Sequence, residues 1–447
     1  LEPVSSSHID SYHVVSDIDK GTMSFEVVSS AADGDVVKVA VLEGGEGYSA
    51  ENPSSKVLAE AVVNNGRAVI KLGQVKTWSP DSPYLYGVRV TLQSYGKVVD
   101  LVDGYTAMRK ISTVRDKTPN KYRRMALNNE PLFQFGPLDQ GWWPDGLYTA
   151  PTEEAMIWDI IKTKEFGFNM IRKHIKTEPA AWYYWCDVYG MLVWQDMPNI
   201  GDHHGYRSYR GNKFKNFGDA RWFDNRSDEV VKAQTNVWSR DSFIGGTDCQ
   251  VPQVWKENYY REWTNIVNAL KGFQCIAVWV PFNEAWGQFD TPAAVKLTRE
   301  LDPTRLINQS SGGNYDLSQG EEGFGDILDV HHYPCPAMNI FERKFVNVLG
   351  EYGGIGLPVE GHTWEIERKW GYGGNKKDSE EVMKTYEEYL EMLKVFVQTG
   401  CAAAVYTQTT DVEGEVNGLI TYDRKVIKVD MPRIAKGNQS VIKSMPK

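Results

Sequence analysis

The most informative segment of this chain is an apolar run that stops at two polar side chains, Ile276-Ala277-Val278-Trp279-Val280-Pro281-Phe282-Asn283-Glu284. A short, continuous apolar run of this kind is typical of a strand that is buried on both faces. The polar residues follow the run directly, which places them at the mouth of a strand and not on the face of a helix. The segment therefore predicts a buried strand that ends in a functional carboxylate.

Seven further apolar runs lie in residues 113–447, and helix-like stretches separate them. The expected strands are Leu132–Phe135, Asn169–His174, Leu192–Met197, Leu306–Gln309, Ile327–His332, Val346–Gly350 and Ala402–Gln408. The stretches with the three- and four-residue apolar spacing of helices are Glu153–Phe166, Pro179–Val188, Tyr259–Leu270, Pro292–Glu300 and Ser379–Gln398. Eight strands that alternate with helices predict a (β/α)₈ TIM barrel over residues 113–447. We expect the long segment Asn199–Gln253 to be a functional loop of this barrel.

Residues 1–112 follow a different pattern, in which short Val-rich segments alternate with turns. Examples are the segments at 36–41, 68–72 and 86–92. Segments with this spacing predict an immunoglobulin-like β-sandwich of about seven antiparallel strands. The polar stretch Ser112–Lys121, which contains Pro119, is the expected linker between the sandwich and the barrel. The predicted fold class is multidomain, a β domain followed by an α/β domain.

The composition fits a globular protein and excludes several kinds of partner. Of 447 residues, 41% are hydrophobic and 24% are charged. The net charge of −10 argues against nucleic acid as a partner. No run of 18 apolar residues occurs, so we expect no membrane insertion, and Leu1–Asp10 shows no signal-peptide pattern. The five cysteines are scattered without a CxxC spacing, which favours buried free thiols over disulfides or a zinc site.

Two glutamates end apolar runs of the predicted barrel, and both suit glycoside chemistry. Glu284 ends the fourth expected strand, and Glu351, in Gly350-Glu351-Tyr352-Gly353-Gly354, ends the seventh. Catalytic residues of this fold lie at the carboxyl ends of the strands. A glycosidic bond needs a proton for its leaving oxygen and a group that traps the cationic carbon, and two carboxyl groups can serve both needs. One carboxyl must then stay protonated and the other ionised.

The segments around these glutamates resemble glycoside hydrolase family 2, the family of β-galactosidases, β-glucuronidases and β-mannosidases. The motifs that carry the resemblance are Asn283-Glu284, Gly350-Glu351-Tyr352-Gly353, Phe166-Gly167-Phe168-Asn169-Met170-Ile171-Arg172 and Trp78-Ser79-Pro80-Asp81-Ser82-Pro83-Tyr84-Leu85-Tyr86. The resemblance covers nearly the whole chain. It implies a retaining exo-β-glycosidase that needs no cofactor and acts on an oligosaccharide or another glycoside.

Specific roles follow from the resemblance. Glu284 would be the acid/base and Glu351 the nucleophile, with carboxyl groups roughly 5–5.5 Å apart. Asn283 would bind the sugar hydroxyl next to the anomeric carbon. Tyr333, in His331-His332-Tyr333-Pro334, would keep the nucleophile ionised, and Arg172 would support it by charge.

Several further residues are candidate substrate contacts. Asp139 and Asp196 are carboxylates near strand ends, and a carboxylate can accept two sugar hydroxyls. Trp286 and Tyr406 are candidate stacking walls, and His331 is a further candidate contact. His331 could instead form a metal site together with the other strand-end histidines, His174 and His332. No His-Glu-x-x-His spacing occurs, so we expect no metal.

Departures from the family pattern leave the sugar open. Lys173-His174 follows Arg172 where the family usually has Ser-His, and Leu138-Asp139-Gln140-Gly141 lacks the His that many members carry. Glu415-Val416-Asn417-Gly418 lacks the lysine of the glucuronidase Asn-x-Lys motif. A β-galactoside is then the default substrate, with a β-glucuronide or β-mannoside as alternatives. Two other readings remain: a catalytically quiet carbohydrate-binding protein that keeps the fold, and a metal-dependent barrel hydrolase.

Overall fold

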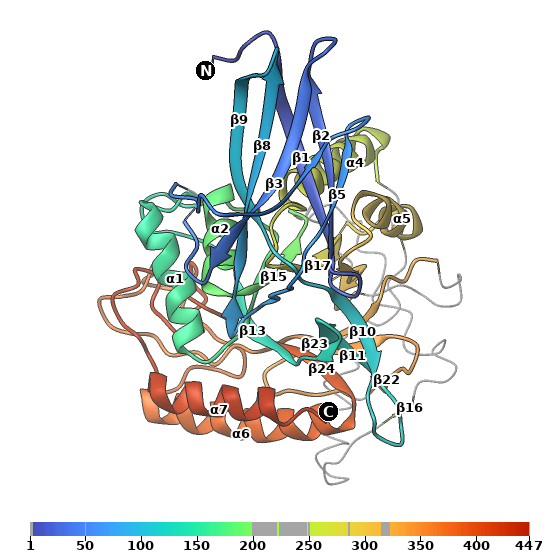
Figure 1. Ribbon diagram of the computed structural model, residues 1–447. Helices are drawn as coiled ribbons and strands as arrows, with labels where there is room; N and C mark the ends of the chain where they lie inside the picture. Colours follow the sequence, from blue (N-terminus) through green and yellow to red (C-terminus); the bar gives the residue numbers. More distant parts are fainter. Residues whose placement is uncertain are drawn as a thin grey trace. The chain divides into compact units, whose positions relative to one another are not determined.

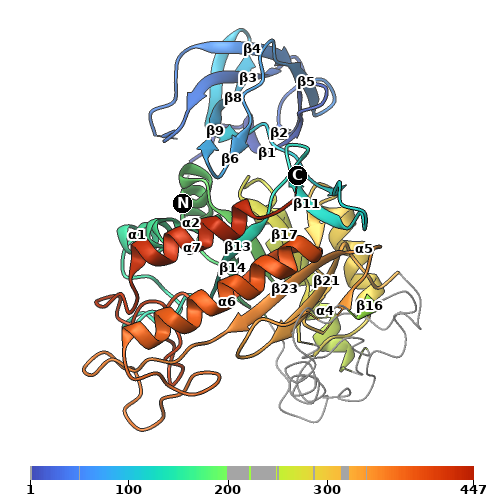
Figure 2. The ribbon, with the colours of Figure 1, turned by 90° about the horizontal axis from the view of Figure 1, so that it is seen from below.

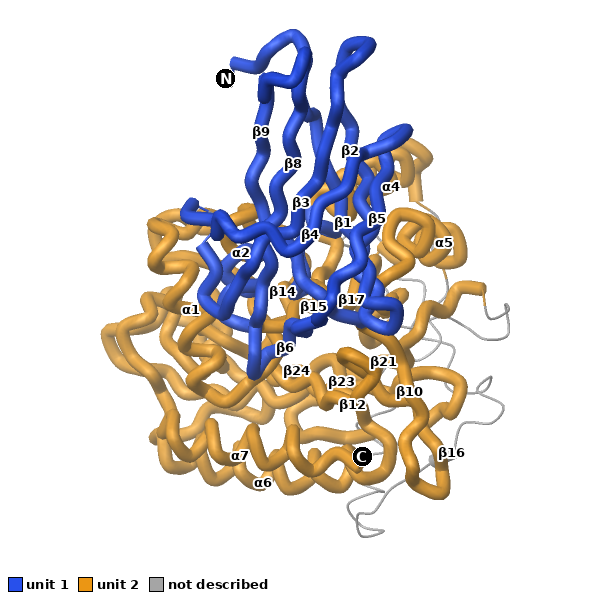
Figure 3. The backbone as a smooth tube through the Cα atoms, viewed as in Figure 1, with its two compact units in different colours: residues 1–110, 183–190, 270–275 blue, residues 111–182, 191–269, 276–447 orange. Residues whose placement is uncertain are grey.

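The computed structural model describes residues 3–49, 51–198, 221–222, 248, 251–284, 287–313, 322–338 and 340–446. The chain divides into two compact units (Figure 3). Unit 1 comprises Leu1–Lys110, Tyr183–Gly190 and Leu270–Cys275, and unit 2 comprises Ile111–Trp182, Met191–Ala269 and Ile276–Lys447. The expected domain boundary between residues 112 and 113 stays a prediction. Most of the predicted loop Asn199–Gln253 and the candidate Trp286 lie outside the described residues.

Unit 1 contains the predicted β-sandwich, in which two antiparallel sheets share one apolar core (Figure 1). The three-stranded sheet has the order β1 (His8–Asp17), β2 (Thr22–Ser30), β5 (Arg67–Lys71), and the four-stranded sheet has the order β4 (Val57–Val62), β3 (Val36–Gly45), β8 (Leu85–Ser94), β9 (Lys97–Thr106). A short hairpin joins β6 (Trp78–Ser79) and β7 (Ser82–Pro83). The sequence pattern did not indicate strand β1, because only one of its ten residues, Ile9, is buried.

Unit 2 contains the predicted barrel of eight parallel strands. These are β13 (Gln134–Asp139), β14 (Met170–Lys173), β15 (Leu192–Asp196), β17 (Ile276–Val280), β19 (Leu306–Ile307), β21 (Ile327–His332), β23 (Val346–Gly353) and β24 (Cys401–Thr407). Ladders join them in the order β21-β23-β24-β13-β14-β15-β17-β19. Between β19 and β21, Asp326 N donates to Ile307 O at 2.8 Å and its Oδ2 accepts from Ile307 N at 2.9 Å, which closes the ring.

The first barrel strand begins two residues later and ends four residues later than the sequence pattern indicated. Strand β13 contains Gly136-Pro137, a pair that argues against a central strand. Glycine is needed there because a Cβ at Gly136 would lie 1.7 Å from Met170 O of the neighbouring strand. As a result Asp139 is the last residue of β13 and not part of the loop that follows it.

The helices of the described residues are α1 (Glu153–Glu165), α2 (Ala180–Tyr189), α4 (Gln253–Leu270), α5 (Thr291–Leu301), α6 (Ser379–Thr399) and α7 (Met431–Lys443). Most of α2 belongs to unit 1, and the others belong to unit 2 apart from Leu270. Helix α7 was not predicted, because its buried stripe contains Asn438 among apolar residues. It lies beside α6 (Figures 1 and 2), where a Cβ at Gly437 would meet Leu390 Cδ1 at 2.4 Å. Within the described part of the chain, no helix has the length and apolarity needed to cross a membrane.

The expected linker Ser112–Lys121 is wrong in part, since its first residues form a strand. Strand β10 (Ile111–Arg115) pairs with β11 (Arg123–Leu127), which also pairs with β12 (Glu130–Pro131). Asp116 and Arg124 form a fully buried ion pair at 2.8 Å. The polarity of these two residues by itself suggests a solvated linker, but their pairing makes burial possible.

The remaining short strand pairs are β16 (Arg221–Trp222) with β22 (Ile340–Phe341) and β18 (Phe282–Asn283) with β20 (Ser310–Ser311).

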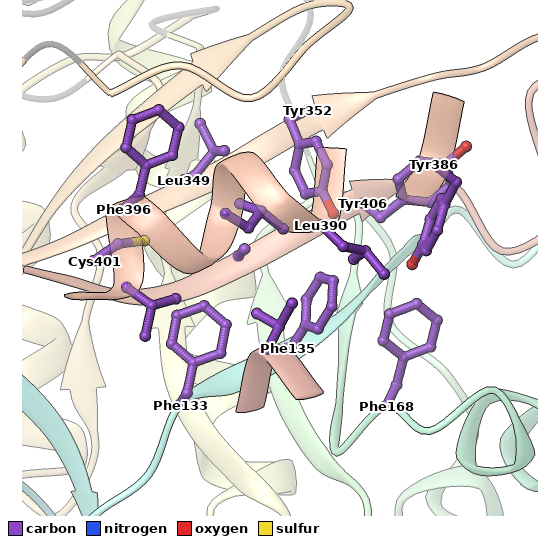
Figure 4. Packing of buried hydrophobic residues seen from close by; sticks show 14 of the residues in the cluster. Phe133, Phe135, Phe168, Leu349, Tyr352, Tyr386, Leu390, Phe396, Cys401 and Tyr406 are labelled. Atoms are coloured by element: carbon purple, nitrogen blue, oxygen red, sulfur yellow. The ribbon is translucent and has the colours of Figure 1, made fainter. Parts of the chain in front are cut away.

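An aromatic core lies between the barrel and helix α6 (Figure 4). Tyr406 belongs to this core and is 0% exposed. Its ring centroid lies 5.7 Å from that of Tyr352 and 5.0 Å from that of Tyr386. The expectation that Tyr406 forms a stacking wall for a sugar does not fit this placement, because its ring is enclosed by protein on strand β24.

Candidate active site

The centre of the candidate site is the buried guanidinium of Arg172, at the end of β14. Its Nη1 donates to Glu351 Oε1 at 3.1 Å, and its Nη2 donates to Asn283 Oδ1 at 2.9 Å. Asp196 binds the same group through both carboxyl oxygens, at 3.2 and 2.9 Å. Burial lowers the pKa of Arg172, but the charges of Asp196 and Glu351 raise it by more than burial lowers it. The guanidinium therefore stays charged. One cation thus joins the ends of β14, β15, β18 and β23.

Glu351 lies on β23 with 6% of its surface exposed. Besides Arg172, it contacts the Tyr333 hydroxyl, which donates to Oε2 at 2.8 Å, and His331 Nδ1, which lies 3.5 Å from the same oxygen. The preceding residue must be glycine, because a Cβ at Gly350 would lie 2.1 Å from a carboxyl oxygen of buried Asp329. The carboxylate is therefore held on both oxygens.

Glu284 follows β18 and faces Glu351. Its backbone has a φ of 50°, an unfavourable value for a residue with a side chain, and its N–H donates to Ser311 O at 2.7 Å. Its Oε1 lies 2.8 Å from His331 Nδ1. One carboxyl oxygen of Glu284, one of Glu351 and a ring nitrogen of His331 all lie within 4.8 Å of one another.

The protonation of Glu284 differs from the simple expectation for a catalytic acid. Burial raises its pKa, but the hydrogen bond and charge of His331 lower it, and the net shift is downward. Burial lowers the pKa of His331, while the charge of Glu351 and the bond to Glu284 raise it, and here the net shift is upward. With these partners, the proton therefore favours the histidine.

His331 is held from its other side by a short polar chain. Its Nε2 lies 2.8 Å from Ser311 Oγ, and Ser311 Oγ donates to Asp329 Oδ2 at 2.5 Å. Asn308 Nδ2 donates to the same oxygen at 2.7 Å. A Cβ at Gly312 would lie 2.5 Å from the imidazole ring, so the loop after β20 packs directly on it. Both ring nitrogens of His331 thus have protein partners, in contrast to the expected sugar contact.

Tyr333 extends the site toward β24. Its hydroxyl contacts Thr407 Oγ1 at 2.5 Å in addition to Glu351, and its ring stacks on Tyr372 with centroids 3.7 Å apart and planes 13° from parallel. Burial and the charge of Glu351 raise the pKa of Tyr333 well above its ordinary value. The phenol is therefore a permanent donor to Glu351.

The two expected sugar-binding aspartates already have protein partners. Asp196 is 1% exposed and accepts from Arg172, and His174 Nδ1 lies 3.1 Å from its Oδ2. Asp139 Oδ2 accepts from Lys173 Nζ at 2.6 Å, and its Oδ1 accepts from Gly141 N at 2.9 Å. This placement makes both carboxylates supports for neighbouring groups and not open acceptors for hydroxyls.

The three strand-end histidines have separate partners. His174 contacts Asp196, His331 contacts Glu284, and His332 Nδ1 lies 2.7 Å from Cys335 O. The histidine cluster considered as a metal site therefore does not form. His331 instead belongs to the acidic pair.

Sequence reasoning did not identify the amide and carboxyl side chains that follow β24. Gln408 Nε2 donates to Glu415 Oε2 at 2.7 Å and to Asn417 Oδ1 at 2.7 Å, and Gln140 Nε2 lies 3.3 Å from the same Glu415 oxygen. Burial raises the pKa of Glu415 to about 7, against the bond from Gln408 and aided by the charge of Glu351. The available signal was the position of Glu415 two residues before Asn417. From the sequence alone, this segment was interpreted only through the lysine that it lacks.

Comparisons with known proteins agree with this architecture. The model described as "Glycosyl hydrolases family 2" matches residues 7–109, and "Glycosyl hydrolases family 2, TIM barrel domain" matches residues 146–343. A β-galactosidase of Thermoanaerobacter pseudethanolicus is 27% identical over 218 residues, which are 45% of this chain and 27% of that protein. A β-galactosidase of Lactococcus lactis is 32% identical over 129 residues, 29% of this chain and 12% of that protein.

A solved structure has the same fold over nearly all of the chain. The β-glucuronidase of Faecalibacterium prausnitzii superposes with a TM-score of 0.66 at 17% identity, covering 96% of this chain and 65% of that one. The chain thus spans about a quarter or less of the two β-galactosidases and about two thirds of the β-glucuronidase. Both family models match in the expected order, and together with the barrel and sandwich they show that this chain belongs to glycosyl hydrolases family 2.

Proposed function

We propose that the chain is an exo-acting β-glycosidase that retains the anomeric configuration, with Glu284 as acid/base and Glu351 as nucleophile. The observation that carries the proposal is the approach of the two carboxyl groups, since one oxygen of Glu284 lies within 4.8 Å of one oxygen of Glu351. Retaining enzymes hold these groups roughly 5–5.5 Å apart, whereas inverting enzymes need about 6.5–9.5 Å for an intervening water. This approach supports the retaining arrangement.

In the first step, Glu351 attacks the anomeric carbon while Glu284 protonates the leaving oxygen. Arg172 and Tyr333 donate to the two oxygens of Glu351, so the attacking carboxylate is oriented. In the second step, Glu284 removes a proton from water, the water oxygen attacks the same carbon, and Glu351 leaves as a carboxylate. The Oδ1 of Asn283 accepts from Arg172, and its Nδ2 would donate to the sugar hydroxyl next to the reacting carbon.

The charges around the site favour a neutral sugar, with a β-galactoside as the first candidate. The hydrogen bonds to Glu415 come from the neutral amides Gln408 and Gln140, and Glu351 acts on it as a like charge. A sugar carboxylate near this group would add a further negative charge beside Glu415 and Glu351. Selectivity for a β-glucuronide is therefore the weaker alternative, although the fold is shared with a β-glucuronidase.

A panel of aryl β-glycosides tests the proposal. Galactoside, glucoside, mannoside and glucuronide are assayed with the chain, and NMR identifies the anomer that forms first. We expect turnover of a neutral glycoside, the β-anomer as first product, and loss of turnover with retained sugar binding in Glu351→Gln. A 2-fluoro glycoside should label Glu351, as mapped by peptide mass spectrometry.

Three outcomes would contradict the proposal. Sugar binding without turnover would favour the carbohydrate-binding alternative. Turnover that a chelator abolishes and a divalent metal restores would favour a metal-dependent hydrolase. An α-anomer as the first product would exclude retention.

A further inference from the structure

A continuous hydrogen-bonded chain runs from the interior of the barrel to the acid/base carboxyl. It begins at Asp329 of β21, which is 0% exposed, and passes through Ser311 and the ring of His331 to Glu284. Each link is between 2.5 and 2.8 Å. The strands of the barrel are themselves joined by backbone ladders and, between β19 and β21, by Asp326.

The direction of each hydrogen bond follows from the groups involved. The Ser311 hydroxyl donates its proton to the Asp329 carboxylate, so its oxygen can only accept from His331. Nε2 of His331 must therefore carry a proton. Nδ1 is then the ring nitrogen that can gain or lose a proton, and it points at Glu284 Oε1 at 2.8 Å.

The other charged groups around the imidazole ring favour a proton between His331 Nδ1 and Glu284 Oε1. Glu351, on β23, lies 3.5 Å from Nδ1, and Asp329 Oδ1 lies 3.9 Å from Nε2. Arg172 Nη1 lies 3.5 Å from Nε2, but its charge is balanced by Asp196 and Glu351. The surroundings of the ring are net anionic, which favours one proton shared between His331 and Glu284.

We propose that His331 is a positioning residue that stores the proton which Glu284 delivers to the leaving group, with Ser311 and Asp329 fixing its tautomer. This role rests on the proposed function. When the C1–O bond breaks and the Glu351–C1 bond forms, the shared proton moves from Glu284 to the leaving oxygen. The pair then holds no exchangeable proton. Water returns one to Glu284 as its oxygen attacks C1 and the Glu351–C1 bond breaks.

The stored proton extends the pH range in which the acid is loaded. Two groups that share a proton titrate as a unit, so the pair has macroscopic pKa values of its own. The pKa of His331 is raised and that of Glu284 is lowered. The pair consequently loses its proton in the range of a raised imidazole, above the ordinary value of about 6.5, whereas an isolated glutamate loses it near about 4.3.

Replacement of the ring by a neutral amide of similar reach tests the inference. His331→Gln, Ser311→Ala and the control His332→Gln are compared by their profiles of kcat/KM against pH. Two substrates are used, a phenyl glycoside that needs an acid and a 2,4-dinitrophenyl glycoside whose leaving group needs none. His332 has its Nδ1 on a backbone carbonyl and does not belong to the chain of hydrogen bonds.

For the phenyl glycoside, His331→Gln should move the basic limb down by about two pH units, the separation of the two ordinary pKa values. At pH 7 the rate should fall by about 100-fold, the lower range of general acid catalysis. Ser311→Ala should shift the limb in the same direction by less, and it serves as the test if His331→Gln does not fold. Rates with the dinitrophenyl glycoside and those of His332→Gln should stay close to those of the unsubstituted chain.

An unshifted basic limb, or an equal loss with both leaving groups, would overturn this role and leave the proposed function intact. Absence of turnover of any aryl glycoside by the unsubstituted chain would overturn the proposed function, and this role with it. The two failures are thus distinguishable in the same set of assays.

Discussion

Removal of a single oxygen from Tyr333 should slow the second half of the reaction more than the first. Tyr333→Phe deletes the hydroxyl that donates to Glu351 Oε2 at 2.8 Å. The ring stack on Tyr372, with centroids 3.7 Å apart, does not depend on that oxygen, so the variant should keep its fold. The change therefore isolates one hydrogen bond to the nucleophile.

The size of the effect follows from the charge on the acceptor. A hydrogen bond to a charged group contributes about 1.5–3 kcal/mol, which corresponds to a rate factor of about 10 to 150. Glu351 loses its charge when it attacks the sugar and regains it when it leaves. Loss of a donor to the carboxylate should thus slow release of the sugar by this factor and leave the first step nearly unchanged.

Stopped-flow measurement of aryl alcohol release distinguishes the two steps. We expect kcat and KM to fall together, with a burst of one alcohol per active site, because the covalent intermediate accumulates. Tyr406→Phe is the matched control, since it removes the same atom from a residue enclosed in the core. An unchanged kcat without a burst in Tyr333→Phe, or the same kinetic change in the control, would refute the reasoning.

Three further perturbations test the site by other measurements. Arg172→Met should lower the free energy of unfolding in urea by about 3–5 kcal/mol, because Asp196 and Glu351 stay buried without their cation; a loss below 1 kcal/mol would contradict this. Gly350→Ala should destabilise by about 1–3 kcal/mol, since its methyl group would lie 2.1 Å from a buried carboxylate, and thermal melting checks it. Glu415 has a pKa raised to about 7, above its unfolded value, so the stability it contributes is complete below about pH 4.3 and is lost as the pH rises through 7. The melting temperature of Glu415→Gln relative to the parent should therefore be higher at pH 8 than at pH 5, and a pH-independent difference would contradict the shift.

Periodicity in the sequence was sufficient to predict the architecture. The buried strands of the barrel are continuous apolar runs, and the sandwich strands alternate, because each pattern is imposed by how many faces of a strand are buried. The pattern failed where burial depends on a partner. Helix α7 has Asn438 in its buried stripe, and strand β10 leads into an Asp116–Arg124 pair whose polarity suggested a linker.

The amino-acid sequence by itself placed Glu284 and Glu351 directly after apolar runs that form buried strands, because a strand buried on both faces is a continuous apolar run. Only the tertiary structure decided which polar groups meet. Ser311 on β20 meets Asp329 and His331 on β21, Glu415 follows β24, and the ring of Tyr406 turns into the core. A hydrogen bond depends on distance and direction to within a few tenths of an ångström, and one-dimensional spacing carries neither across strands that are tens of residues apart.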